Sequence, residues 1–243
     1  MTVSGRPSLT VVLPTYNERD SIAACITAFA TMPEVDEVLV INNNAADGTS
    51  AQVALTGARE VCEPRQGYGA AIQRGLREAR TDLIAVCEPD GTFDPTDLRK
   101  LLAFMPECGF VVGSRTVNEF IWDGANMGWF LKWGNWAVAK WVEVLYNTTS
   151  LSDVGCTFRV MTRAHADYLL EHSTMDGSAY GLEMLVLTAK SGTKMVQVPV
   201  NYHPRVGESS VTGDLSKTIP LGVKMFAMST SMRMKEPRRQ KSR

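Results

Sequence analysis

A chain of 243 residues is long enough to bury a core as one large domain, alone or with an appendage. Its hydrophobic fraction of 44% is that of an ordinary soluble globular protein, and its net charge of −1 excludes a strong overall field toward nucleic acid. The charge is uneven, because one acid and eight bases follow Asp214. Such a basic end indicates either an anionic surface as partner or a merely solvated tail.

Apolar runs of strand length alternate with helical patterns over the first half of the chain. The predicted strands are residues 9–13, 37–41, 58–62, 83–87 and 110–113, and the predicted helices are 21–30, one from about 47, one from 67, and 95–104. Strands that alternate with helices need crossover connections, which predicts an α/β fold with a mostly parallel sheet flanked by helices.

The cysteines and the hydropathy pattern bear on location. The five cysteines form no CxxC pair, which indicates reduced thiols and a cytoplasmic protein. No apolar run of about 18 residues occurs, so we expect no membrane-spanning helix.

The strand predicted at 83–87 ends abruptly in acids. Glu88 and Asp90 follow it, separated by Pro89. Ligands of open α/β sheets bind beyond the carboxyl ends of the strands, and Mg²⁺ and Mn²⁺ favour one or two carboxylates together with phosphate oxygens. A helix start is the alternative for this acidic run, since Asp94 and Pro95 form an N-cap and a first helical position. That alternative accounts for Asp94 but leaves Glu88 and Asp90 unexplained.

A series of motifs from about residue 8 to residue 215 resembles the family 2 glycosyltransferases of GT-A fold. The similarity is greatest to the branch of polyprenyl-phosphate (dolichol-phosphate) mannose or glucose synthases. The motifs, in chain order, are Val12-Leu-Pro-Thr-Tyr-Asn-Glu18, Asn42-Asn43-Asn44 with Asp47-Gly48-Thr49, Gly67-Tyr68-Gly69, Glu88-Pro-Asp90, Gly113-Ser-Arg115, Asp153-Val-Gly-Cys-Thr-Phe-Arg159, Tyr180-Gly-Leu-Glu-Met184 and Arg205-Val-Gly-Glu-Ser209. The resemblance implies a GT-A domain at 1–212, with a donor-binding half at about 8–115, an acceptor-side half at about 116–212, and a basic, amphipathic C-terminal segment at 213–243.

The resemblance also implies where a nucleotide diphosphate sugar binds. Pro14, Tyr16 and Glu18 match the family's base and ribose contacts, together with Ile41 and Asn43. The alternative for this stretch is an ordinary loop. Asn43 stands where the family usually has an acid, so the base preference of relatives does not transfer.

The implied metal and phosphate ligands come from four later motifs. Glu88 and Asp90 would hold Mg²⁺ or Mn²⁺ against the diphosphate beside Pro89, although the family more often has aspartate at the first position. The cations that match are Arg115, Arg159, Arg205 and, in place of the family's lysine after the Gly-Glu-Ser triplet, Lys217. Arginine grips phosphate in a bidentate fork, whereas the alternative for each arginine is a surface ion pair.

Asp153 lies where the family places its candidate base, so the resemblance assigns catalysis to Asp153, Asp90 and Arg205. A lipid phosphate is already a competent nucleophile near neutral pH, since its second pKa is about 6. Asp153 would then orient groups or balance charge. A turn before Gly155 is the structural alternative.

All five tryptophans fall between residues 120 and 146, and Trp129, Trp133 and Trp136 are spaced to share one helical face. This clustering favours a membrane boundary or an acceptor groove, with core packing as the alternative. Residues 215–234 have an amphipathic, basic pattern suited to an anionic bilayer, although Pro220 and Gly222 weaken a long helix.

The resemblance, together with these patterns, implies an inverting, metal-dependent hexose transfer from a GDP- or UDP-sugar to a polyprenyl phosphate at the cytoplasmic membrane face, by a protein that contacts the membrane peripherally and binds no nucleic acid. One alternative is the same fold acting on a soluble glycan or small-molecule acceptor. A second alternative is an inactive nucleotide-sugar binding module.

Overall fold

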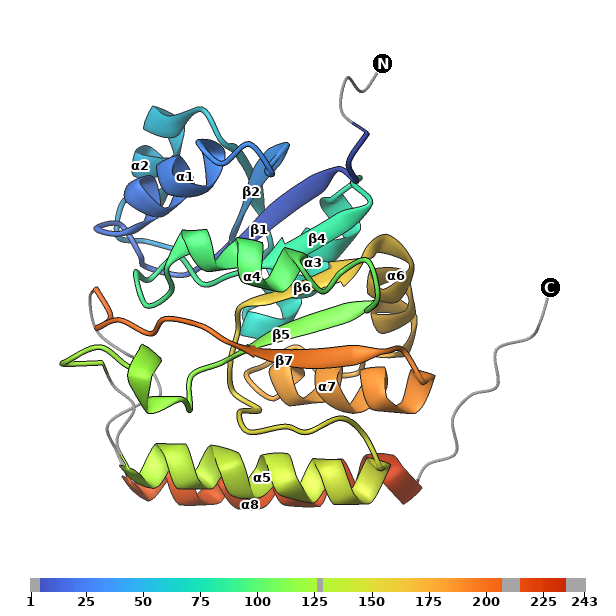
Figure 1. The fold of residues 1–243 in the computed structure, drawn as a ribbon. Helices are drawn as coiled ribbons and strands as arrows, with labels where there is room; N and C mark the ends of the chain where they lie inside the picture. Colours follow the sequence, from blue (N-terminus) through green and yellow to red (C-terminus); the bar gives the residue numbers. More distant parts are fainter. Residues whose placement is uncertain (1–4, 126–128, 207–214, 235–243) are drawn as a thin grey trace.

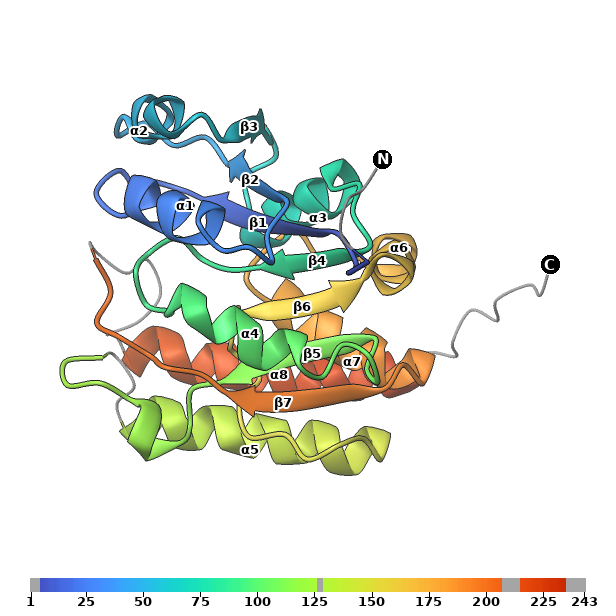
Figure 2. The ribbon, with the colours of Figure 1, turned by 45° about the horizontal axis from the view of Figure 1, so that its top comes forward.

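The computed structural model describes residues 5–125, 129–206 and 215–234; within α5 and α8, side chains are described only from residues 132 and 222 onward. Seven strands within these ranges form one sheet in the order β3-β2-β1-β4-β6-β5-β7 (Figure 1, and Figure 2, where β3 is labelled as well). The strands are β1 Leu9–Thr15, β2 Glu37–Asn42, β3 Arg59–Cys62, β4 Leu83–Val86, β5 Phe110–Ser114, β6 Arg159–Thr162 and β7 Met195–Pro199.

Among these seven strands, only β6 runs against its neighbours, since it pairs antiparallel with β4 and β5 while the other pairings are parallel. The predicted α/β class with a mostly parallel sheet is therefore confirmed. Strand β6 comes from the second half of the chain and lies between two strands of the first half, so both halves contribute to one sheet. The division at about residue 115 stays a prediction.

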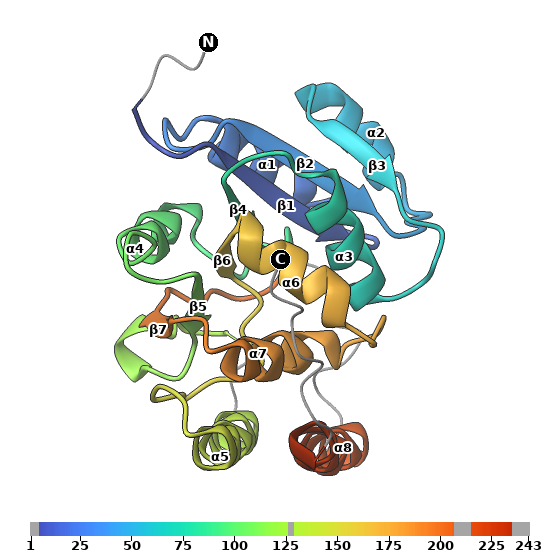
Figure 3. The ribbon, with the colours of Figure 1, turned by 90° about the vertical axis from the view of Figure 1, so that its right-hand side faces the viewer.

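Helices cover both faces of the sheet. The helices are α1 Ile22–Ala30, α2 Thr49–Thr56, α3 Tyr68–Glu78, α4 Leu98–Leu102, α5 Trp129–Tyr146, α6 Arg163–His172, α7 Tyr180–Ser191 and α8 Leu215–Met234, with 3-10 turns η1 Pro95–Asp97 and η2 Asn118–Phe120. Helices α1 and α4 lie on one face, and α3, α6 and α7 on the other (Figure 3). Helices α5 and α8 form a further layer that packs on α7.

The central strands are buried as their apolar sequences predict. All seven residues of β1 are buried, and Ile84, Ala85 and Val86 of β4 are at most 1% exposed. Since β1 and β4 are adjacent and parallel, their carboxyl ends meet at one edge, which positions the residues that follow them side by side.

One element differs from the sequence prediction, and a second is more regular than its sequence suggests. The helix expected at 95–104 is a 3-10 turn followed by the short α4, although Asp94 accepts the expected cap bond from the Thr96 N–H at 2.9 Å. The segment 215–234 is one continuous helix despite Pro220 and Gly222. Helix α8 packs along α5 and α7, and such tertiary packing outweighs weak local propensity.

Within the part of the chain that is described, no helix has the length and apolar character needed to cross a membrane.

Candidate active site

A cleft of about 560 Å³ lies at the carboxyl ends of the central strands. It is lined from the ends of β1, β2 and β4, from the start of α3, and from the loop after β7, by Pro14, Thr15, Tyr16, Asn17, Glu18, Asn43, Gln66, Tyr68, Ala71, Glu88 and Arg205. Six of the residues predicted for substrate binding therefore surround one space: Pro14, Tyr16, Glu18, Asn43, Glu88 and Arg205.

Arg205 joins the two acidic motifs of the cleft. Its Nη1 lies 3.0 Å from Asp90 Oδ2, and its Nη2 lies 3.2 Å from Glu18 Oε1. The other oxygen of Glu18 accepts from the Thr15 hydroxyl at 2.7 Å and from the Tyr16 N–H at 2.5 Å. Burial raises the pKa of Glu18 despite these bonds and the charge of Arg205. Arg205 Nε is itself buried and has no hydrogen-bond partner among the described residues.

Glu88 lines the cleft, whereas Asp90 is not among its lining residues and is linked to it through Arg205. Asp90 is 1% exposed, and its Oδ1 accepts from the Thr92 N–H and hydroxyl at 3.0 and 2.6 Å. Burial raises the pKa of Glu88 to about 7, and the adjacent charge of Asp90 adds to the rise while Arg205 and Arg115 oppose it. Because a half-buried carboxylate this close to another acid is costly to ionise alone, the pair favours a bound cation.

Two oxygen-bearing carboxylates fit a hard divalent cation such as Mg²⁺ or Mn²⁺. Among the described residues, no cluster of three or more metal-ligating side chains is found. The helix-start alternative applies to Asp94, which caps η1, but not to Glu88 or Asp90.

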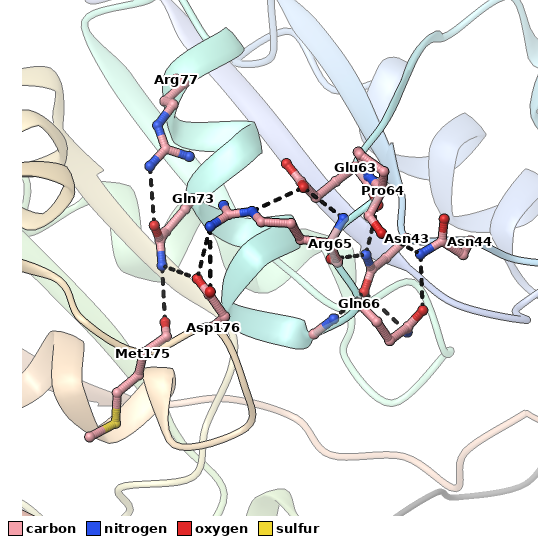
Figure 4. A network of polar contacts seen from close by, with 11 residues as sticks. Asn43, Asn44, Glu63, Pro64, Arg65, Gln66, Gln73, Arg77, Met175 and Asp176 are labelled. Carbon is pink, nitrogen blue, oxygen red and sulfur yellow. Dashed lines mark hydrogen bonds and ion pairs between the residues drawn. The ribbon is translucent and has the colours of Figure 1, made fainter.

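Asn43, which follows β2, lines another part of the cleft. Its Nδ2 donates to the carbonyl oxygens of Glu63 and Arg65, and its Oδ1 accepts from the Gly67 N–H at 2.8 Å (Figure 4). Arg65 also contacts Asp176, with 3.4 Å between Nη1 and Oδ2. The amide at this position therefore holds the loop 63–67 in place, and the loop carries Gln66 into the cleft.

Two glycines let the start of α3 approach the chain at residues 175–176. The Ala70 N–H donates to the Asp176 carbonyl at 2.9 Å. A Cβ on Gly67, whose φ is +148°, would lie 2.3 Å from that carbonyl oxygen, and one on Gly69 would lie 2.8 Å from the Met175 oxygen. The Gly67-Tyr68-Gly69 motif thus has a steric basis, and it places Tyr68 in the cleft.

Arg115 and Asp153 form a buried pair beside the cleft. Arg115 Nε and Nη2 donate to the two oxygens of Asp153 at 2.8 and 3.0 Å, and the Arg115 and Gly155 N–H groups donate to them as well. Burial raises the pKa of Asp153, but the charge and hydrogen bonds of Arg115 outweigh burial, so the pKa lies below its ordinary value. Asp153 is thus held as an anion, and its role as a base stays a prediction.

The remaining predicted residues do not line the cleft. Arg159 is 2% exposed and donates to the carbonyl oxygens of Cys156 and Gly181, so it is not a surface ion pair. Ile41 is fully buried within β2, and Pro89 is buried between the two acids. The side chain of Lys217 lies outside the described residues. The phosphate role of Arg159 and Lys217 stays a prediction.

Sequence reasoning assigned no role to Gln66 and Tyr68, both of which line the cleft. Burial raises the pKa of Tyr68 well above its ordinary value, with Glu88 contributing. The signal for Tyr68 was present, because it stands between the two glycines that open α3. No sequence pattern marks Gln66 as a cleft residue, because its position depends on the hydrogen bonds by which Asn43 holds the loop 63–67.

Three comparisons relate this chain to known proteins. Residues 10–167 match the model of glycosyl transferase family 2. An uncharacterized glycosyltransferase of Mycobacterium tuberculosis is 34% identical over 87% of this chain and 93% of its own length. An undecaprenyl-phosphate mannosyltransferase of Micrococcus luteus is 25% identical over 84% of this chain and 87% of its own length.

The fold is shared with solved structures. Glucosyl-3-phosphoglycerate synthase of Mycobacterium tuberculosis, crystallised with Mn²⁺ and UDP-glucose, superposes with a TM-score of 0.73 over 96% of this chain and 81% of its own, at 17% identity. The family match covers more than half of the chain and includes the β1, β2 and β4 ends that form the cleft. This chain belongs to glycosyl transferase family 2 and is a glycosyltransferase with a GT-A-like fold.

Proposed function

We propose that this chain transfers a hexose from a GDP- or UDP-sugar to a polyprenyl phosphate, with inversion, and that Glu88 and Asp90 hold the divalent cation required. The observation that carries the proposal is that Glu18, Glu88 and Arg205 line one cleft and that Asp90 pairs with Arg205. These residues come from three separate motifs, and the strand ends bring them together.

The donor would lie along the cleft from Tyr16 to Asp90. Tyr16 is 49% exposed, which leaves its ring available for a base. Glu18 would accept from ribose hydroxyls once Arg205 turns to the diphosphate, since a guanidinium pairs more strongly with phosphate than with a single carboxylate oxygen. The amide wall formed by Asn43 and Gln66 would face the base.

The reaction breaks the bond between the anomeric carbon and the diphosphate oxygen, and the electron pair leaves with the nucleotide diphosphate. An oxygen of the acceptor phosphate forms the new bond from the opposite side. A cation at Glu88 and Asp90 would supply charge stabilisation to the leaving diphosphate. Arg205 would supply it as well, because its Nε and two Nη atoms form a fork suited to phosphate oxygens.

The acceptor assignment is supported by the undecaprenyl-phosphate mannosyltransferase relative. An acceptor phosphate with a second pKa of about 6 needs no base near neutral pH. Asp153 already binds Arg115 through both oxygens. We propose that Asp153 orients Arg115 rather than removing a proton.

Thermal unfolding with a panel of GDP- and UDP-sugars, with and without Mn²⁺, tests the donor. A ligand at 100 times its Kd stabilises the folded state by about 2.7 kcal/mol, which is readily seen as a rise in Tm. We expect one base series to raise Tm, and only with the metal. The variant Asp90→Asn should lose the response, whereas Asp94→Asn, a change at the nearby cap acid, should keep it.

Transfer assays then test the acceptor. The expected result is sugar transfer to a polyprenyl phosphate in detergent and none to soluble glycans or phosphorylated metabolites. Transfer to a soluble acceptor alone would refute the lipid assignment while leaving the donor site intact. A donor response with neither transfer nor hydrolysis would identify an inactive binding module instead.

A further inference from the structure

Helix α5 exposes an apolar stripe to solvent. Its inner face, with Val138, Ala139 and Val142, is buried against the rest of the protein. On the opposite face lie Trp133, Trp136, Lys140 and Val144, which share one side at helical spacing, and Trp133, Trp136 and Val144 are 50%, 42% and 77% exposed. Core packing therefore explains only the inner half of this helix.

Helix α8 lies beside α5 and presents a second stripe. Trp141 Nε1 donates to the Thr230 hydroxyl at 3.2 Å, and the Tyr146 hydroxyl donates to the Ser229 carbonyl at 2.6 Å. Val223 and Met234 face outward and are 64% and 81% exposed. Figures 1 and 3 show the two helices side by side, at the outside of the molecule below α7.

We define the α5–α8 platform by its exposed apolar residues, namely Trp133, Trp136, Trp141, Val144, Val223 and Met234. The two helices that carry these side chains are also rich in positive charge. The two helices contain Lys132, Lys140, Lys217, Lys224 and Arg233 against one acid, Glu143, in a chain whose net charge is −1. Glu143 is itself paired with Lys140 at 2.7 Å.

The platform thus combines tryptophan, aliphatic side chains and an excess of lysine and arginine. Indole rings suit the boundary between hydrocarbon and headgroups, and basic side chains suit anionic headgroups. A neutral protein partner would gain from the apolar stripe but would leave this positive charge unmatched. Complementarity of charge therefore favours an anionic lipid surface as the occupant.

We propose that the α5–α8 platform is the face on which this protein rests on an anionic bilayer. Figure 1 shows both helices beginning on the side of the molecule toward which β1 and β4 point, where the cleft lies. The platform would thereby hold the cleft near the bilayer surface, and in this respect the inference rests on the proposed lipid-phosphate acceptor. The binding itself does not depend on catalysis.

Sedimentation of the full chain with phosphatidylcholine vesicles, with or without 30% phosphatidylglycerol, tests the inference. We expect binding to the anionic vesicles, weakened by salt, with a blue shift of tryptophan fluorescence. Each basic residue near an anionic surface adds attraction equivalent to about fivefold in affinity, so Lys224→Glu should weaken binding at least that much.

Val144→Glu tests the apolar stripe, and Leu55→Glu on α2 is the matched control, since the two side chains are 77% and 79% exposed. We expect the first change alone to reduce vesicle binding. Equal effects of both changes, or equal binding to neutral vesicles, would overturn the inference. Self-association abolished by Val144→Glu, without vesicle binding, would overturn it in favour of a second copy.

The donor response separates this inference from the proposed function. The Tm rise with nucleotide sugar should be unchanged in Val144→Glu. Vesicle binding by a wild-type protein that responds to no nucleotide sugar would support the platform while refuting the proposed function.

Discussion

Two arginine–carboxylate clusters lie near the carboxyl ends of the strands, and they differ in how completely they are satisfied. Arg115 and Asp153 share two side-chain hydrogen bonds, and the Asp153 side chain is fully buried. Arg205 contacts Glu18 and Asp90 through one ion-pair contact each, and its side chain is 27% exposed. Its Nε has no hydrogen-bond partner among the described residues. Asp153 is fully bonded within the protein, with four donors on its two oxygens, whereas Arg205 has capacity for a ligand.

The comparison teaches that a matched motif does not by itself show how far an arginine is already bonded within the protein. Both arginines follow strand ends and both were predicted to bind phosphate. Burial and remaining hydrogen-bonding capacity separate them. Changes to the buried cluster should therefore act mainly on stability, and changes to the cleft cluster should act mainly on binding and rate.

The largest effect is expected for Asp153→Ala. The change leaves the buried Arg115 guanidinium without its partner, which typically costs about 3–5 kcal/mol of unfolding free energy. Urea denaturation measures this. Asp167→Ala is the matched control, since Asp167 is 65% exposed in its pair with Arg163 and should cost about 1 kcal/mol or less. Equal losses for both variants would contradict the distinction.

Arg205→Ala should lower the transfer rate far more than it lowers the free energy of unfolding. Loss of a group that stabilises charge in the transition state lowers the transfer rate by about 10²–10³-fold. The free energy of unfolding should fall by less than in Asp153→Ala, because Asp90 keeps its two hydrogen bonds from Thr92 and Glu18 keeps those from Thr15 and Tyr16. Arg99→Ala, which removes the exposed pair with Glu34, should leave the rate unchanged. A loss of unfolding free energy as large as that of Asp153→Ala would contradict the contrast between the two clusters.

Gly69→Ala tests the frame that holds the cleft wall. The added methyl would lie 2.8 Å from the Met175 carbonyl oxygen, so we expect a loss of about 1–3 kcal/mol and weaker donor binding. Gly177→Ala introduces a methyl with nothing within 4 Å and should be neutral. Urea denaturation of both variants measures the difference, and an equally stable Gly69→Ala would contradict the steric role.

The pH dependence of donor binding should show the smallest effect. Glu88 has a pKa of about 7, so a proton competes with the cation below that pH. From pH 8 to pH 6, the Kd for nucleotide sugar with Mg²⁺ should rise about tenfold by calorimetry. The pH dependence of the Kd should flatten in Glu88→Gln. An unchanged pH profile in that variant would show that Glu88 is not the group whose protonation weakens donor binding.

The raised pKa of Glu88 also affects the stability of the protein without ligand. Stability should fall with rising pH, whereas donor binding should strengthen. A carboxyl whose folded pKa is raised holds its proton in the folded state. The stabilising contribution of Glu88 is therefore full below its ordinary pKa of 4.5 and is lost as the pH rises through about 7.

Much of this fold follows from local sequence. The apolar run at 83–87 and its acidic end predicted β4, observed at Leu83–Val86, and the position of Glu88, because a doubly buried strand needs continuous apolar residues. Other features depend on distant contacts. Nothing near Asn43 indicates that its amide would bind residues 63–67, and nothing near Arg115 indicates that Asp153 would occupy its guanidinium. The continuity of α8 through Pro220 likewise depends on its packing against α5 and α7.

The central claim is that Glu88 and Asp90 grip the diphosphate of a nucleotide sugar through a divalent cation. The most direct test is the anomalous scattering of Mn²⁺ in crystals of the protein soaked with a donor. The account predicts one manganese peak within coordination distance of both carboxylates and of two phosphate oxygens, with Arg205 turned toward the diphosphate. A donor bound in the cleft with manganese elsewhere, or with both carboxylates facing away from it, would contradict the claim.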